Sequence, residues 1–303
     1  MTQLVRIRRF EQRCIDLEGK IPGFVPVRLG EDAIAVGVAQ ALRSADRVVT
    51  RSRHHAYALA RGLAMNELMA ELFGRVAGFC RGRGGTGHLY SADRYFYSDQ
   101  TFATGGLPMA AGLALADTLQ NRQRVTVCFF NATAGAVGNG FDSLNMARSL
   151  SLPLLGVCEQ RLGRRRNEPP DATVKKTQVQ TRLAEQLRAW AAVEVDSLDV
   201  LAVEAAAVFA YDAIRRGHGP QLLIYDSPAE GSKRARSDWP DQGAIERLSQ
   251  WLRGNDQLTD AAGSAIEATL DWEFKSAVQF ASASAIETLD AFVWRRSRVP
   301  PWR

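Results

Sequence analysis

Short apolar segments alternate with helical segments along the first 225 residues, and this alternation limits the possible folds. The clearest apolar segments are Val125–Phe130, Leu154–Cys158 and Gln221–Tyr225, and shorter ones occupy 48–50 and 190–195. A strand that is apolar on both sides must be covered on both sides, which is typical of parallel sheets between helices. The pattern therefore predicts a doubly wound α/β fold, with ligands bound beyond the carboxyl ends of the strands.

The pattern changes near residue 237. Residues 244–252 and 260–282 predict two helices with no strand between or after them. We therefore expect an α/β domain over residues 1–236 and a C-terminal helical extension over residues 237–303.

Composition excludes some classes of function. The net charge is +5, but the basic residues are spread along the chain in small clusters such as Arg164–Arg166, so we do not expect a nucleic-acid partner. Such clusters are more typical of a solvated surface, or of a site for an anionic small molecule or an acidic partner. No apolar run is long enough for a membrane helix, so no membrane partner is expected. The four scattered cysteines and the absence of a secretory signal predict a cytoplasmic protein with reduced thiols.

The loop after the strand at 125–130 carries the most informative motif. It begins Phe129-Phe130-Asn131-Ala132-Thr133, and Ser143-Leu144-Asn145-Met146-Ala147 follows it. This segment resembles the diphosphate-binding segment of the E1 alpha subunits of thiamine-diphosphate-dependent 2-oxoacid dehydrogenases, which act on pyruvate, branched-chain 2-oxoacids or acetoin.

The resemblance covers nearly the whole chain. Further matching segments are Arg8–Glu11, Leu29–Ala33, Met69–Gly74, Gly78–Gly85, Gly105–Pro108 and Leu152–Glu159. It implies the fold of the thiamine-diphosphate-binding type, E1 alpha and transketolase-like, for residues 1–236. It also implies an E1 beta-like partner in an α2β2 assembly, or a homodimer, because the family's beta subunit supplies the glutamate that activates the cofactor.

The same resemblance implies the site residues. Arg53 aligns with an arginine that contacts the diphosphate, and His55 aligns with a histidine near the reactive thiazolium. We therefore expect His55 to be catalytic, with a hydrogen-bonded loop histidine as the alternative. Asn131, Gln160 and Arg161 occupy the two ends of the family's cofactor motif, so the resemblance makes them, with Arg53, the candidate cofactor-binding residues if a cofactor is bound.

Both ends of the metal-binding motif depart from the family. Ala132 stands where the family has a magnesium-binding aspartate, and Gln160-Arg161 replaces a pair of asparagines. The spacing of the motif is kept, but magnesium prefers a near-octahedral set of oxygens that includes carboxylate. We therefore expect no bound metal and no cofactor. Thiamine diphosphate with magnesium is expected only if the chain is active.

Three functions are open at this point, and whether the chain is an enzyme is uncertain. The leading hypothesis is a degenerate E1 alpha-like subunit, a pseudoenzyme that has lost magnesium-dependent cofactor binding and acts with a beta-like partner in a structural or repurposed role. The alternative is an active thiamine-diphosphate-dependent subunit in which Arg53 and Arg161 replace the metal. A basic nucleic-acid-binding scaffold is the weakest hypothesis.

Overall fold

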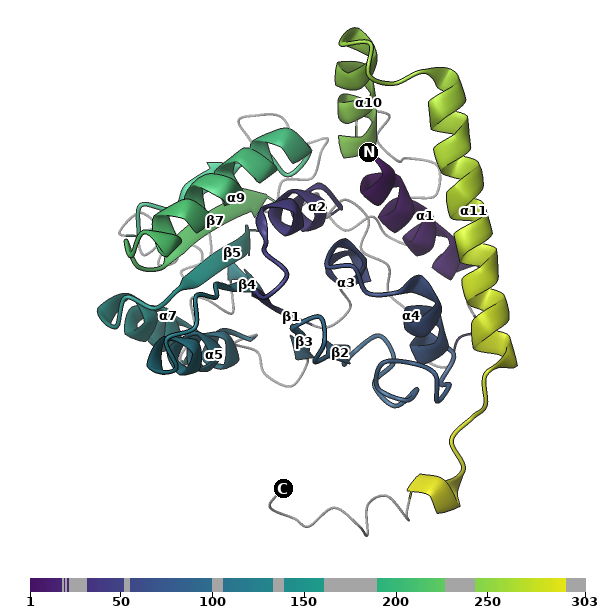
Figure 1. Ribbon diagram of the computed structural model, residues 1–303, viewed down its shortest axis with the longest axis horizontal. Helices are drawn as coiled ribbons and strands as arrows, with labels where there is room; N and C mark the ends of the chain where they lie inside the picture. The colour runs from purple at the N-terminus through teal and green to yellow at the C-terminus, as the bar shows by residue number, and fades with distance from the viewer. Residues whose placement is uncertain are drawn as a thin grey trace, which may run out of the picture.

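A seven-stranded sheet forms the centre of the computed structural model, which describes residues 1–17, 19, 21, 32–51, 55–99, 106–132, 139–160, 190–226 and 243–292. The strands lie in the order β2-β3-β1-β4-β5-β7-β6. All neighbouring strands pair in parallel except β2, which runs antiparallel to β3. The predicted α/β class is therefore confirmed (Figure 1).

The elements follow one another along the chain as predicted, apart from two strands. In chain order they are α1 (Thr2–Asp16), α2 (Asp32–Ala41), β1 (Arg47–Arg51), α3 (His55–Ala60), α4 (Met65–Leu72), β2 (Tyr90–Ser91), β3 (Phe96–Asp99), α5 (Leu107–Leu119), β4 (Thr126–Asn131), α7 (Asn139–Ser149), β5 (Leu154–Gln160), β6 (Val193–Val195), α9 (Val200–Arg215), β7 (Gln221–Asp226), α10 (Ala244–Gly254) and α11 (Asp260–Ala283). The sequence pattern does not predict β2 and β3, because both are too short to show a period.

Helices cover both faces of the sheet, as the apolar strands require. Val48 and Val127 pack into one core with residues of α2, α3 and α9. Val49 and Cys128, their neighbours along the strands, pack into a second core with residues of α5 and α7. Successive strand residues point to opposite faces, so β1, β4, β5 and β7 each contribute to both cores. Figure 1 shows α2 and α9 on one side of these strands and α5 and α7 on the other.

The parallel register brings the carboxyl ends of the strands to one edge of the sheet. The last residue of β1, Arg51, pairs with Asp99 at the end of β3. Asn131 at the end of β4 pairs with Glu159, and Gln160 at the end of β5 pairs with Asp226. Polar residues therefore end these strands at the edge where a doubly wound fold binds its ligands.

Buried ion pairs hold the opposite, amino edge of the sheet. The guanidinium of Arg47 donates two hydrogen bonds to the Asp117 carboxylate, at 2.6 and 3.0 Å. Asp46 accepts from Arg215 at 2.6 Å and from the backbone N–H of Val125 at 2.9 Å. Both carboxylates are fully buried, so these partners are needed to offset the loss of hydration.

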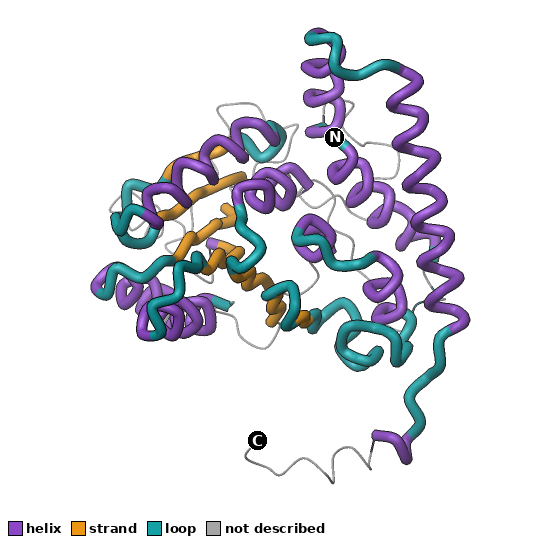
Figure 2. The backbone as a smooth tube through the Cα atoms, in the orientation of Figure 1, coloured by secondary structure: helices purple, strands orange, loops and turns teal. Residues whose placement is uncertain are grey.

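The C-terminal helix α11 lies along α1 and α4 (Figures 1 and 2). Leu270 and Phe274 of α11 are buried, and Arg6 of α1 forms an ion pair with Glu273 at 2.6 Å. Arg9 and Arg13 pair with Glu267 and Asp271 further along the two helices. The division of the chain at residues 236 and 237 stays a prediction. Among the described residues, none of the helices combines the length and the apolar character needed to cross a bilayer.

The glycine-rich segment at 81–88 winds around one buried carboxylate. Glu71 at the end of α4 accepts hydrogen bonds from the backbone N–H groups of Cys80, Gly82, Gly84 and Gly85, at 2.7 to 3.0 Å. Gly82 has φ +75°, and a Cβ there would lie 2.2 Å from the Gly74 carbonyl carbon. The glycines thus let the backbone close around the carboxylate.

Glu287, just beyond α11, fixes the C-terminal segment to this loop. Its carboxylate accepts from Arg83 Nε at 2.6 Å and from Arg81 Nε at 3.0 Å. Nearby, the Arg83 guanidinium lies 4.7 Å from the ring centre of Phe292. The hydrogen bond from Arg83, reinforced by Arg81, lowers the pKa of Glu287 to about 2.

Replacing Glu71 should unfold the loop that surrounds it. In Glu71→Gln, the side-chain NH₂ would face backbone N–H groups that donate hydrogen bonds to the carboxylate in the wild type. Those N–H groups would then stay buried without an acceptor. We expect the free energy of unfolding to fall by about 3 kcal/mol in urea titrations. The control is Glu67→Gln one turn earlier on α4, with an expected change within about 0.5 kcal/mol. Equal stability of the two variants would contradict this role for Glu71.

The contact of Glu287 predicts a pH-dependent stability. Because the folded pKa is about 2 and the ordinary value is 4.5, the contact stabilises the protein fully above pH 4.5. Its contribution is lost as the pH falls from 4.5 towards 2. The difference in unfolding free energy between the wild type and Glu287→Gln should therefore be constant at neutral pH and shrink at acid pH. A difference that stays unchanged in urea titrations down to about pH 3 would rule this out.

Candidate functional site

Three adjacent strands bring the predicted site residues to the carboxyl edge of the sheet. β1 ends just before residues 52–54, and β4 and β5 end at Asn131 and Gln160. These strands are direct neighbours in the order β1-β4-β5. Arg53 and Arg161 follow β1 and β5 along the chain but lie outside the described residues, as does the side chain of Gln160. The described structure therefore unites the strand ends that carry the predicted site, while the contacts of both arginines remain predictions.

His55 begins α3, a few residues beyond the end of β1, and its side chain is fully buried. Its Nδ1 lies 3.1 Å from Oε1 of Glu11 on α1, a residue that is 2% exposed. The ring of Phe10 stands edge-on to the imidazole at 5.7 Å between ring centres. Within the described part of the chain, His55 Nε2 and Glu11 Oε2 have no hydrogen-bond partner.

More buried charge lies beside this pair on α1 and α2. Arg8, one turn before Glu11, donates a hydrogen bond of 2.6 Å to Asp32 Oδ2. The other oxygen of Asp32 is buried and has no hydrogen-bond partner among the described residues. Burial, and next the neighbouring Glu11 carboxylate, raises the pKa of the Cys14 thiol well above its usual value. The group around His55 is thus a buried polar cluster inside the first core.

Sequence reasoning missed Glu11 as a partner of His55. The signal was present, because Glu11 lies on the same face of α1 as the buried residues Ile7, Phe10 and Cys14. A carboxylate on an apolar helix face needs a buried partner. That this partner is His55, 44 positions away, follows only from the packing of α3 on α1.

Magnesium does not fit the described residues at this edge. The side chain of Ala132, which the resemblance aligns with the family's aspartate, packs against the second core and offers no oxygen. Asn131 is half-buried next to it. No group of three or more metal-binding side chains (His, Cys, Asp or Glu) occurs in the described ranges. Whether a metal ion binds at this edge stays a prediction, because residues 52–54, 133–138 and 161–189 lie outside the described part of the chain.

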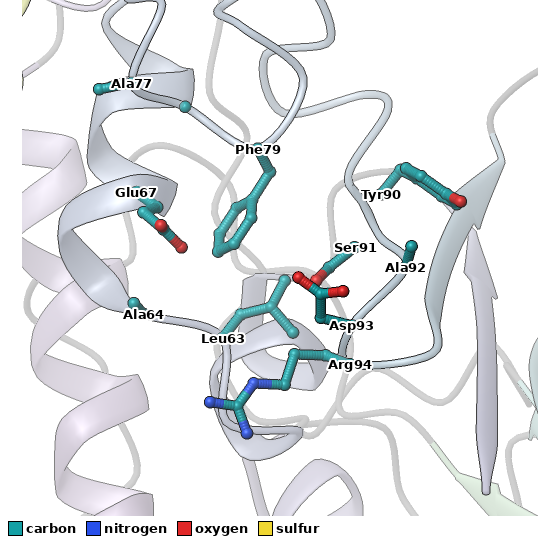
Figure 3. A pocket seen from close by; sticks show the side chains of 11 residues that line it. Leu63, Ala64, Glu67, Ala77, Phe79, Tyr90, Ser91, Ala92, Asp93 and Arg94 are labelled. Atoms are coloured by element: carbon teal, nitrogen blue, oxygen red, sulfur yellow. The ribbon is translucent and has the colours of Figure 1, made fainter. Parts of the chain in front are cut away.

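A pocket of about 560 Å³ lies elsewhere, beside the turn between β2 and β3 (Figure 3). Phe79 and the carboxylates of Glu67 and Asp93 line it. Because Asp93 comes before β3, this pocket is at the amino end of that strand, away from the carboxyl edge. It is therefore not the predicted cofactor site.

The comparisons with known proteins agree with the resemblance seen in the sequence. The family model "Dehydrogenase E1 component" matches residues 2–227. The chain is 30% identical over 302 residues to the pyruvate dehydrogenase E1 component subunit alpha of Porphyra purpurea, covering 91% of this chain and 86% of that one. It is 33% identical over 226 residues to the alpha subunit of acetoin:2,6-dichlorophenolindophenol oxidoreductase of Bacillus subtilis, covering 73% and 66%.

A third relative is the pyruvate dehydrogenase E1 component subunit alpha of Rhizobium meliloti, at 32% identity over 225 residues. This match covers 73% of the chain and 63% of the relative, so the chain spans less than two thirds of the length of some relatives. A solved structure assigned as a thiamin diphosphate-dependent enzyme of Mycobacterium smegmatis is 17% identical, with a TM-score of 0.40 over 65% of this chain and 31% of that one. That likeness is too low to support an inference.

The family match overturns one expectation. The motif of this chain predicts no cofactor, because Ala132 and Arg161 align with the family's metal ligands. The matched family consists of thiamine-diphosphate-dependent enzymes, so the match points to thiamine diphosphate as the cofactor. The expectation was wrong because it equated loss of a metal ligand with loss of the whole cofactor site.

Proposed function

Because the chain belongs to the dehydrogenase E1 component family, we propose that it is the alpha-type subunit of a thiamine-diphosphate-dependent 2-oxoacid dehydrogenase and works with a beta-like subunit. The observation that supports this most is the family match over residues 2–227, which includes all three strands of the candidate site. Thiamine diphosphate, when bound, supplies the electron sink for decarboxylation of a 2-oxoacid.

The chain's own residues would bind and orient the diphosphate. Arg53 and Arg161 carry guanidinium groups, which pair with phosphate oxygens in a planar, two-pronged geometry. Asn131 and Gln160 bring amide groups on neighbouring strand ends. His55 is the proposed catalytic residue, on the segment that follows β1.

We propose further that magnesium contributes less here than in relatives with an aspartate at position 132. The diphosphate carries several negative charges, which need cations nearby in a partly buried site. Ala132 supplies no metal ligand, and a guanidinium at position 161 would repel a metal ion while attracting phosphate. What is lost in this proposal is the dependence on magnesium, not the binding of thiamine diphosphate.

Calorimetry with the complex of this chain and its beta-like partner tests both parts. We expect thiamine diphosphate to bind, with an affinity that changes less than about tenfold, or 1.4 kcal/mol, when EDTA replaces magnesium. Arg161→Ala should weaken binding by about 10-fold to 100-fold, from the loss of a charge-assisted contact. Arg94→Ala, an exposed arginine beside β3 at the opposite edge, is the control and should bind normally.

The outcomes separate the two parts of the proposal. No binding with or without magnesium would overturn the proposed function. Binding that EDTA abolishes would overturn only the reduced role of magnesium. In Ala132→Asp, which restores a carboxylate, we expect the dependence on magnesium to increase.

We also propose that the chain assembles with a beta-like partner or a second copy through surfaces that include α5. Gly112 on α5 is exposed, and a Cβ added there would meet nothing within 4 Å. Large apolar side chains are also exposed elsewhere, such as Phe209 at 66% and Trp272 at 70%. Because Gly112 has no side chain, the backbone of a partner can approach α5 closely, so the surface around Gly112 suits tight packing.

Gly112→Trp should therefore block assembly without harming the fold. Light scattering should give a mass above the 33.3 kDa of one chain for the wild type, with its partner or alone, and a smaller particle for the variant. The control is Gly263→Trp on α11, where a Cβ also meets nothing. A wild-type particle of 33.3 kDa under both conditions would show that assembly does not occur.

A further inference from the structure

We propose that Glu11 is a positioning residue that holds His55 in a single tautomer, with the proton on Nδ1 and a free lone pair on Nε2. This inference rests on the proposed function, in which His55 is the catalytic residue. Glu11 lies on the first helix and is not part of the diphosphate motif, so the inference gives a role to a residue outside that motif.

The contact itself sets the tautomer. Glu11 Oε1 lies 3.1 Å from His55 Nδ1, and an ionised carboxylate can only accept a hydrogen bond. Nδ1 must then carry the proton, so in the neutral imidazole Nε2 is the acceptor. When a carboxylate accepts a hydrogen bond from one imidazole nitrogen, the other nitrogen is left in position to take up a proton, as in many enzymes that use histidine as a base.

Packing leaves the imidazole little freedom to turn. His55 has no exposed surface, and Phe10 and Glu11 approach it from α1. Phe10 is itself held edge-on against Phe274 of α11 at 6.2 Å between ring centres. The ring of His55 is therefore fixed by a helix that is in turn held by the C-terminal helix.

The free nitrogen distinguishes this pair from the structural ion pairs. Asp117 and Glu71 each accept several hydrogen bonds through both carboxylate oxygens. His55 Nε2, by contrast, is buried and has no partner among the described residues. A buried polar atom without a partner is unfavourable, and a lone pair left bare is less so than an unpaired N–H. The tautomer with its proton on Nδ1, facing Glu11, is thus the one that the surroundings favour.

Nuclear magnetic resonance of the full chain, labelled with ¹⁵N-histidine, measures the tautomer directly. The chain has four histidines, so His54→Gln, His88→Gln and His218→Gln identify the signals of His55 by elimination. We expect one nitrogen, Nδ1, to be protonated and Nε2 to be unprotonated at neutral pH. In Glu11→Gln, whose amide can either accept or donate, we expect a mixture of tautomers or the opposite one. A wild-type ring protonated on Nε2 or on both nitrogens, or an unchanged tautomer in Glu11→Gln, would overturn the proposal.

The control is Asp32→Asn, which neutralises another buried carboxylate of the same cluster. Asp32 is 3% exposed and pairs with Arg8, not with His55. The variant should show a comparable loss of stability but the wild-type tautomer. A shift of the tautomer in Asp32→Asn as large as in Glu11→Gln would mean that general destabilisation, and not the Glu11 contact, sets the proton position.

Turnover of the complex with the beta-like partner and thiamine diphosphate gives the second readout. In Glu11→Gln we expect kcat to fall about 10-fold to 100-fold with KM within about twofold, because the loss concerns proton transfer and not binding. A normal kcat in this variant, with an altered tautomer, would overturn the positioning role. If the wild-type complex has no thiamine-dependent turnover while the tautomer responds to Glu11 as expected, the contact is upheld and the proposed function fails.

Discussion

Parallel pairing of β1, β4, β5 and β7 is the constraint on which the rest of this structure depends. Parallel strands bury both faces, so the chain must supply helices for each face, and it does so with α2, α3 and α9 on one and α5 and α7 on the other. The same pairing sends all carboxyl ends to one edge. That edge receives Asn131 and Gln160 and is followed by the segments that carry Arg53 and Arg161. The fold therefore concentrates polar groups at one edge while ion pairs such as Arg47–Asp117 close the other.

Buried charges in this protein fall into two kinds, and the distinction bears on function. Asp46, Glu71 and Asp117 have their carboxylate oxygens in hydrogen bonds, which suits a structural role. Glu11 and His55 share one hydrogen bond and keep one atom each without a partner in the described structure, as does Asp32 beside Arg8, but only His55 leaves a ring nitrogen. Complete pairing favours a fixed framework, whereas a buried atom left free is available for a proton or a ligand.

The fold of this chain does not depend on the residue that the resemblance aligns with the family's aspartate. That residue, Ala132, packs against the second core. The packing of β4 does not depend on that residue, because the strand is held by its apolar neighbours Phe129 and Phe130. Fold and metal ligand are thus independent features, which is why loss of the aspartate does not by itself settle whether thiamine diphosphate binds.

The sequence alone determined the α/β alternation, the two C-terminal helices and the family resemblance, because each of these is a local pattern or a spacing. The tertiary structure alone decided the contacts between distant segments. β3 pairs with β1, although its four residues are too few to show the alternating pattern of a strand. Glu11 contacts His55, which lies 44 positions away in the sequence. Periodicity reports which face of an element is buried but not which partner covers it. The partner depends on how whole elements pack, and that packing placed a carboxylate of the first helix against the proposed catalytic histidine.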